Sequence, residues 1–214
     1  MNRPDTAPYE RSLGRQPLIL ASASPRRREL LARLVDAFVV EPADIDEARR
    51  PGEAPREYVM RMAREKAEVV AARHPGRCVL GADTTVTLDE ECLGKPDDAQ
   101  AAAVMLQRLS GRAHHVLTSV WLVLPEAAGL GALSTTEVNF ADVPSDWIAS
   151  CIKSGEPMDK AGAYAIQGSA AVWIARLNGS YTGVVGLPLF ETADLLRKAG
   201  LTGPDPSLHA RTTT

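Results

Sequence analysis

The sequence predicts an α/β fold built around a mixed β-sheet. Short apolar runs that suit buried strands alternate along the chain with longer stretches of helical periodicity. Two β-rich runs, His115–Leu124 and Leu133–Phe140, are joined by a glycine-containing loop, and their spacing indicates an antiparallel ribbon. The 214 residues are 45% hydrophobic and 24% charged, which is ordinary for a globular protein and enough for one sizeable core or for two lobes that share one.

In the first half of the chain, strands and helices are expected to alternate. Ser24 and Pro25 suit the N-cap and the first position of a helix, and Pro75-Gly76 ends a second, longer helix. An acidic turn is expected at Asp89-Glu90-Glu91. The expected strands are Pro17–Ala21, Ala37–Glu41 and Cys78–Leu88, and the expected helices are Pro25–Leu34 and Pro55–His74.

The second half contains the antiparallel ribbon, three helices and one more strand. The loop of the ribbon is expected at Pro125–Gly131, and Asn178-Gly179 suits a turn after the last strand. Gly200 stands just past the last helix, where glycine often ends a helix. The expected helices are Asp97–Leu109, Pro144–Lys153 and Leu187–Ala199, and the expected strand is Ala170–Leu177.

The two ends and the overall charge limit the classes of function. Residues 1–16 and 201–214 are expected to be a flexible N-terminal extension and a C-terminal tail around one domain that covers residues 17–200. Residues 1–16 lack the apolar core of a secretory signal, and no apolar run reaches the roughly 18 to 20 residues that span a bilayer. The net charge of -3 leaves no broad basic surface. We therefore expect a cytoplasmic protein that binds neither membranes nor polymeric nucleic acid.

Three arginines stand at the start of the first expected helix. Arg26, Arg27 and Arg28 follow the loop Ala21–Pro25, where free backbone amides and the helix dipole favour an anion and disfavour cations. Arginine binds phosphate through two parallel hydrogen bonds, so the cluster indicates a polyphosphate site. A solvated basic helix start that pairs with nearby acids is the alternative. The loop is not a Walker A motif, because it lacks the glycine spacing and the terminal Lys-Ser/Thr.

Two charged residues fall on faces that are expected to be buried. Lys66 lies on the apolar stripe of the long helix, seven residues after Val59. Asp83 lies in the middle of a buried strand, where a carboxylate is costly unless it is paired or binds a metal. The functional interpretation is a cleft that contains both groups. The structural alternatives are a lysine that extends to the edge of its face and an Asp–Arg pair.

The remaining polar signals are weaker. Gln167 stands alone among small and apolar residues in a glycine-bounded segment, and an amide can recognise a base edge because it both donates and accepts; an ordinary loop amide is the alternative. Lys95, taken alone, is a solvated loop lysine. Adjacent His114 and His115 point to opposite faces of a strand. The histidines and cysteines form no transition-metal motif, so any metal is expected to be a hard cation held by carboxylates, above all magnesium.

Together these segments resemble the Maf family of nucleotide pyrophosphatases, in the family's order and over about residues 17–200. The matching segments are Leu20–Leu31, Ala63–Lys66, Gly81–Thr84, Gly94–Pro96, Leu109–Gly111, His115–Thr118, Asp159–Gly168 and Val185–Pro188. The resemblance implies the fold of inosine-triphosphate pyrophosphatases, a long twisted mixed sheet with helices that form two lobes around a cleft. It also implies hydrolysis of a nucleoside triphosphate between the α and β phosphates, which gives a monophosphate and pyrophosphate. Homodimers are common in the family, so a second copy of the chain is a candidate partner.

The resemblance also implies roles for single residues. Asp83 matches the family's catalytic acid, proposed as the general base that prepares the attacking water. Glu47 matches a carboxylate placed near the metal, so Glu47 and Asp83 are expected to hold a divalent cation, Mg²⁺ first and Mn²⁺ or Co²⁺ as alternatives. The residues that match phosphate-binding positions are Arg26, Arg27, Lys66 and Lys95.

The resemblance extends to the choice of base. Arg26, Thr84 and Gln167 agree with the branch of dTTP/UTP pyrophosphatases, whereas the branch that prefers 7-methyl-GTP tends to carry an aromatic residue, Gln and Glu there. Uracil and thymine present an N–H between two carbonyls, which suits an amide. The expected substrates are therefore dTTP, UTP and related modified pyrimidine nucleotides. The alternatives are a pyrophosphatase for 7-methyl-GTP or other modified nucleotides, and a regulatory nucleotide-binding inhibitor of septum formation with little turnover.

Overall fold

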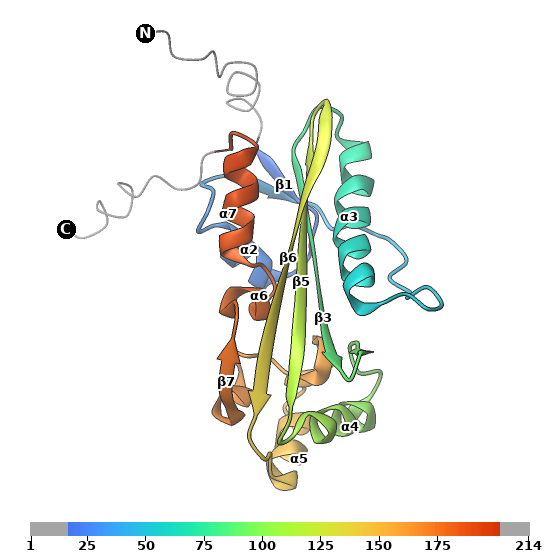
Figure 1. Cartoon of the computed structure of the whole chain (residues 1–214), viewed down its shortest axis with the longest axis vertical. Helices are drawn as coiled ribbons and strands as arrows, with labels where there is room; N and C mark the ends of the chain where they lie inside the picture. Colours follow the sequence, from blue (N-terminus) through green and yellow to red (C-terminus); the bar gives the residue numbers. More distant parts are fainter. Residues whose placement is uncertain (1–16, 202–214) are drawn as a thin grey trace, which may run out of the picture.

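The computed structural model describes residues 17–201 and shows an α/β fold around one mixed sheet (Figure 1). The sheet has seven strands in the order β2-β1-β3-β5-β6-β7, and β4 pairs with β3. The strands are β1 (Leu18–Leu20), β2 (Phe38–Val40), β3 (Val79–Leu88), β4 (Glu91–Leu93), β5 (Ala113–Leu124), β6 (Ala127–Phe140) and β7 (Ile174–Asn178). The predicted α/β class is confirmed. The predicted extension, residues 1–16, lies outside the described residues, and so does the predicted tail, residues 201–214, apart from Leu201.

Within residues 17–201, six α-helices pack around the sheet. They are α2 (Pro25–Leu31), α3 (Pro55–Arg73), α4 (Ala99–Leu109), α5 (Ser145–Lys153), α6 (Tyr181–Val185) and α7 (Leu189–Lys198). Three short 3₁₀ helices lie between α5 and β7, namely η1 (Glu156–Asp159), η2 (Ala161–Ala163) and η3 (Ser169–Trp173). Ser24 caps α2 as predicted, since its hydroxyl accepts a hydrogen bond from the Arg27 amide. No helix among the described residues is long and apolar enough to cross a membrane.

The pairing along β3 leaves an opening in one edge of the sheet. The first residues of β3 pair in parallel with β1, up to Leu80, and its last residues pair antiparallel with β4, from Val86 onward. Its other edge pairs with β5 over nearly its whole length. In the described part of the chain, Gly81–Thr85 thus has no strand beside it on the first edge. The polar middle of β3 is therefore open to loops rather than to another strand.

The hydrophobic core divides on either side of this opening. One cluster, which includes Leu20, Leu31 and Leu196, joins β1, α2 and α7 to the first half of β3. A second cluster, which includes Leu106 and Phe140, packs α4 and α5 on the other end of the strands. The long strands β5 and β6 connect the two ends, which form the two predicted lobes (Figure 1).

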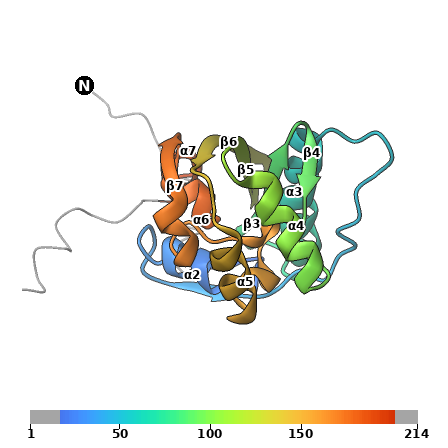
Figure 2. The same cartoon turned by 90° about the horizontal axis from the view of Figure 1, so that it is seen from below.

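Alternation along β3 sends neighbouring side chains to opposite faces of the sheet. Val79 packs with residues of α3, whereas Leu80 packs with the cluster around α2 and α7. Figure 2 shows α3 and α7 on opposite sides of the strands. Gly81 lets α3 lie close, because a Cβ there would stand 2.2 Å from the Ala63 carbonyl oxygen. The glycine therefore brings the middle of α3 against the middle of β3.

The ribbon differs from the prediction in the length of its strands. Pro125–Gly131 was predicted as a loop, but β5 runs to Leu124 and β6 begins at Ala127, so only two residues turn the chain. Gly129 and Gly131 are strand residues covered by the ring of Trp121, since a Cβ at either would stand within 2.6 Å of the indole. The two glycines are therefore explained by the bulky Trp121 ring on the neighbouring strand rather than by a loop.

Three further assignments need correction. Glu91 belongs to β4 rather than to the acidic turn, because Asp89 and Glu90 take positive φ and close the hairpin alone. The strand predicted from Ala170 begins only at Ile174, since the Glu156 carboxylate accepts a hydrogen bond from the Ser169 amide and the chain turns into η3. The short helix α6, capped by Ser180, was not predicted.

Candidate active site

A cleft of about 690 Å³ lies at the opening in the edge of β3. It is bordered by the loop before α2, the loop before α3, the middle of β3 and the segment Asp159–Gln167. Every residue predicted for catalysis, substrate binding or metal binding lines it: Arg26, Arg27, Glu47, Lys66, Asp83, Thr84, Lys95 and Gln167. Residues far apart in the sequence thus meet in one cavity, while their individual roles stay predictions.

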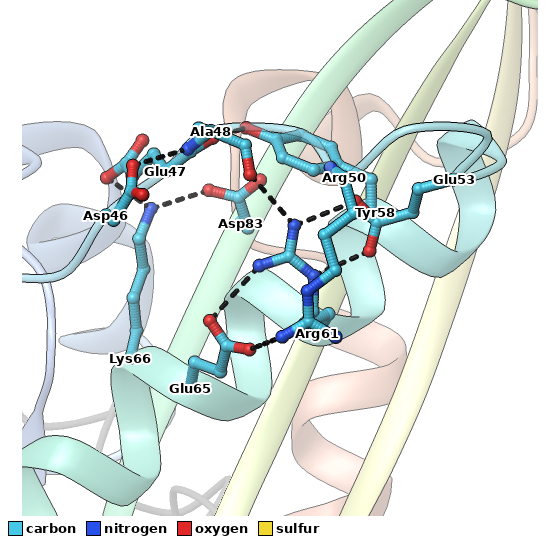
Figure 3. Close-up of polar contacts among 10 residues, drawn as sticks. All are labelled: Asp46, Glu47, Ala48, Arg50, Glu53, Tyr58, Arg61, Glu65, Lys66 and Asp83. Carbon is cyan, nitrogen blue, oxygen red and sulfur yellow. Dashed lines mark hydrogen bonds and ion pairs between the residues drawn. The ribbon is translucent and has the colours of Figure 1, made fainter.

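At the centre of the cleft, one ammonium joins two carboxylates. The Nζ atom of Lys66, on α3, lies 2.7 Å from Oδ1 of Asp83 and 2.8 Å from Oε1 of Glu47 (Figure 3). The side chains of Lys66 and Asp83 are each 9% exposed, whereas that of Glu47 is 51% exposed. Lys66 therefore does not extend to the edge of its helix face, and the partner of Asp83 is a lysine rather than an arginine.

Burial and charge act in opposite directions on these two acids. Burial raises the pKa of the Asp83 carboxyl, and the charges of Lys66 and Arg27 only partly oppose that shift. Partial burial also acts to raise the pKa of Glu47, but the hydrogen bond from Lys66 and the charges of Lys66 and Lys95 outweigh it, so that pKa lies below its usual value. Burial therefore makes the Asp83 carboxylate a stronger base than an exposed aspartate, whereas Lys66 favours the ionised form of Glu47.

Arg27 is fixed by three hydrogen bonds from its guanidinium. Its Nε donates to the Gly186 carbonyl at 2.9 Å, Nη1 donates to the Ser22 hydroxyl at 3.3 Å and Nη2 donates to the Thr84 hydroxyl at 3.2 Å. Burial lowers the pKa of this guanidinium, although arginine stays charged in proteins. The side chain brings a positive charge to the cleft in one fixed orientation.

Two threonine hydroxyls connect Arg27 to the backbone of α6 through hydrogen bonds. The hydroxyl oxygens of Thr84 and Thr118 are 3.0 Å apart, and Thr118 donates to the Gly183 carbonyl at 2.7 Å. Thr118 is fully buried on β5, opposite Thr84 in the antiparallel register. Thr84, predicted to contact substrate, thus also holds Arg27. Thr118 had no role predicted from the sequence, although a polar side chain in a buried strand is a signal that it needs a partner.

The other predicted substrate residues lie nearer to solvent. The side chain of Arg26 is 30% exposed, and its guanidinium lies 3.7 Å from the Asp159 carboxylate. This arginine therefore pairs with an acid, as expected in the alternative interpretation of the arginine cluster. Lys95 and Gln167 are exposed on loops. His114 and His115 behave as predicted, one buried and one exposed.

Two carboxylates of the cleft, Glu47 and Asp83, are the candidate ligands for a magnesium ion. No group of three or more acidic, histidine or cysteine side chains within residues 17–201 could hold a metal alone. Glu47 and Asp83 both reach the same point, since both contact Lys66 Nζ. Magnesium commonly uses one or two carboxylates with phosphate oxygens and water. The residues fit a metal that arrives with a triphosphate.

Two residues of α3 support the site but gave no separate signal in the sequence. The Tyr58 hydroxyl donates to the backbone carbonyl of Glu47 at 3.1 Å, and Tyr58 also lines the cleft. Arg61, one turn further along α3, binds the same loop through Ala48 and Glu53. In the sequence they look like ordinary polar residues of an amphipathic helix, and the folded loop that half-buries them reveals their contacts.

The chain is similar to known proteins in sequence and in structure. Residues 17–199 match the family model described as Maf-like protein. A dTTP/UTP pyrophosphatase from Myxococcus xanthus is 56% identical over 187 residues, which cover 87% of this chain and 94% of that protein. A dTTP/UTP pyrophosphatase from Anaeromyxobacter dehalogenans is 54% identical over 194 residues, with 87% and 96% covered. A HAM1 protein from Coxiella burnetii is 18% identical, with 86% and 99% covered and a TM-score of 0.47.

Proposed function

The chain belongs to the Maf-like protein family, and we propose that it hydrolyses dTTP and UTP, and related modified pyrimidine nucleotides, to the monophosphate and pyrophosphate. As a class, it is a nucleoside triphosphate pyrophosphatase, like the relatives named dTTP/UTP pyrophosphatase. One observation carries the proposal for this site. A buried carboxylate, Asp83, lies beside two cations, Lys66 and Arg27, in a cleft large enough for a nucleotide.

The chemistry is a problem of charge and of proton transfer. A triphosphate brings about four negative charges, and the transition state spreads charge over its oxygens. Arg26 and Lys95 would bind these oxygens from the border of the cleft, and Arg27 and Lys66 would do so from its inner part. In a buried site each of these contacts is stronger than in water.

Asp83 would act as the general base. Its carboxylate takes one proton from a water molecule, whose oxygen attacks a phosphorus atom next to the α–β bridge. The bridging P–O bond breaks, and pyrophosphate leaves as the monophosphate forms. The raised pKa of Asp83 makes its carboxylate a stronger base than an exposed aspartate, while the ammonium of Lys66 keeps the ionised form accessible.

Glu47 and Asp83 would hold a divalent cation, Mg²⁺ first and Mn²⁺ or Co²⁺ as alternatives, together with substrate phosphates. Such an ion lowers the pKa of a bound water and neutralises phosphate charge. The pairing of both carboxylates with Lys66 supports this pair as the donor set. A homodimer, a cytoplasmic location and a part in septum formation stay predictions.

Base recognition is proposed for Gln167. Its amide can accept a hydrogen bond from the N–H of uracil or thymine and donate to the neighbouring carbonyl. Guanine presents two neighbouring donors there, which a carboxylate suits better. The exposed position of Gln167 on the border of the cleft supports a contact with the base rather than with the phosphates.

The test is the release of pyrophosphate, with magnesium, from UTP, dTTP, CTP, GTP, ATP and 7-methyl-GTP. Selective release from UTP and dTTP supports the proposal, and selective release from 7-methyl-GTP replaces the substrate with that alternative. Tight binding of UTP with no release from any nucleotide would instead indicate a regulatory nucleotide-binding protein. Omitting magnesium while chelating residual metal tests the metal separately.

A further inference from the structure

The loop that carries Glu47 has no regular secondary structure. It covers residues 41–54, between β2 and α3, and extends beside the helix before it enters it (Figure 1). From Asp46 to Gly52 every residue is exposed, so apolar burial cannot fix this part of the loop. Yet the Glu47 carboxylate lies 2.8 Å from Lys66 Nζ in the cleft. Some other interaction must keep Glu47 in place.

Arg61 makes the densest set of contacts to this loop. Its Nε and Nη2 donate to the two oxygens of the Glu53 carboxylate at 2.6 and 2.7 Å, and Nη2 also donates to the Ala48 carbonyl at 3.1 Å (Figure 3). The side chains of Arg61 and Glu53 are only 14% and 8% exposed. Arg61 lowers the pKa of Glu53 to about 2, which keeps that carboxylate ionised. The loop is thus bound at its middle and near its end.

Two other residues of α3, Tyr58 and Glu65, add contacts on either side of Arg61. On the side of the cleft, the Tyr58 hydroxyl donates to the Glu47 carbonyl at 3.1 Å. On the far side, Glu65 accepts from Arg61 at 3.2 Å and from Arg50 of the loop at 3.1 Å. Arg61 itself does not line the active cleft, so any effect on the reaction is expected to pass through the loop.

We propose that Arg61 is a positioning residue for the reaction: it fixes the loop on α3 so that the Glu47 carboxylate meets Lys66 in the cleft. Only a guanidinium suits this place, because the two parallel bonds to Glu53 and the third bond to Ala48 need a planar group with several donors. The kinetic part of the inference rests on the proposed pyrophosphatase activity, but the structural part does not.

Limited trypsin digestion tests the structural part without any nucleotide. The Arg49–Arg50 bond lies in the exposed part of the loop and is a direct reporter of its attachment. In Arg61→Gln, we expect cleavage at this bond, identified by mass spectrometry, to be at least about tenfold faster than in the native chain, because the loop opens more often. The matched control is Arg64→Gln, which loses an ion pair to Glu68 and a cation–π contact with Trp121 but no contact to the loop.

Enzyme kinetics test the functional part. Since displacing a catalytic group by about 1 Å can cost roughly a hundredfold, we expect Arg61→Gln to lower kcat/KM for UTP by about tenfold to a hundredfold. Arg64→Gln should keep native kinetics, and Arg61→Lys should recover little, since it restores charge without the planar fork. In a double-mutant cycle, Arg61→Gln should add little to the loss caused by Glu47→Gln.

Several outcomes would overturn the inference. They are equal protease sensitivity of Arg61→Gln and Arg64→Gln, full recovery by Arg61→Lys, or losses that add fully in the cycle with Glu47. If Arg61→Gln does not fold by circular dichroism, Glu53→Gln breaks the same contact from the loop side and goes through the same assays. If no nucleotide is hydrolysed at all, the proposed function fails, and the trypsin result still decides whether Arg61 holds the loop.

Discussion

Two parts of the cleft differ in how their side chains are held. The inner group, Arg27, Lys66, Asp83 and Thr84, is buried or half-buried, and its members contact one another or the backbone at 2.7 to 3.2 Å. The outer group, Lys95 and Gln167, is exposed on loops. A buried and hydrogen-bonded charge acts strongly and in one orientation, whereas an exposed polar group can adapt to what it meets. We therefore expect the inner group to serve the chemistry common to all triphosphates, and in the outer group we expect Lys95 to bind phosphate and Gln167 to distinguish among bases.

The inner group is tested most severely by Asp83→Asn. The amide keeps the shape of the carboxylate but cannot take a proton, so we expect pyrophosphate release to fall by about a hundredfold or more. The control is Asp89→Asn, at the exposed turn just after the same strand, which should keep native activity. The comparison requires that both variants keep the melting temperature of the native chain, so that a loss of rate is not a loss of folded protein. Near-native turnover in Asp83→Asn would remove Asp83 from the mechanism and would leave the inner group as a binding site only.

Arg27→Lys separates fixed orientation from charge. Lysine keeps the positive charge but cannot reach Gly186, Ser22 and Thr84 at once, so we expect kcat/KM to fall by roughly tenfold to fiftyfold. Arg28→Lys, on the exposed side of the same helix, is the matched control and should change nothing. If Arg27→Lys retained full activity, charge alone would be enough, and the difference between the inner and outer groups would lose its meaning.

The inner group was the more readily predicted of the two. Lys66 and Asp83 stand out in the sequence because a charge on an apolar stripe or in a buried strand breaks a local rule, and such breaks concentrate at functional sites. The α/β class and most helices were also predictable, because apolar periodicity and helix caps are local patterns in the sequence. The sequence did not reveal the supports, Thr118 and Arg61, because their partners are distant in sequence and come together only through the sheet register and the path of the loop.

The outer group is tested by Gln167→Glu. A carboxylate can only accept, so it loses the bond to a uracil carbonyl and gains a match to the paired donors of guanine. We expect the ratio of kcat/KM for UTP over 7-methyl-GTP to fall by about tenfold, with turnover of the better substrate largely kept. Gln107→Glu, exposed on α4, controls for the added charge. An unchanged ratio would take base recognition away from Gln167.

The segment that carries the outer group has a buried anchor, and this anchor gives the smallest expected effect. Tyr164 lies three residues before Gln167, and its hydroxyl is 2.7 Å from Nε2 of His114 in the core. Burial lowers the pKa of His114 to about 4, whereas the unfolded chain takes up a proton near the ordinary value of 6.5. The contribution of neutral His114 to the free energy of unfolding is therefore fully present above about pH 6.5 and is lost as the pH falls toward 4, with a loss of about 1 kcal/mol or less at pH 6.

Urea unfolding at pH 7 and pH 6 should show this loss in the native chain and a smaller one in His114→Gln, which does not titrate. Equal losses in both chains would mean that the outer segment does not depend on a neutral His114.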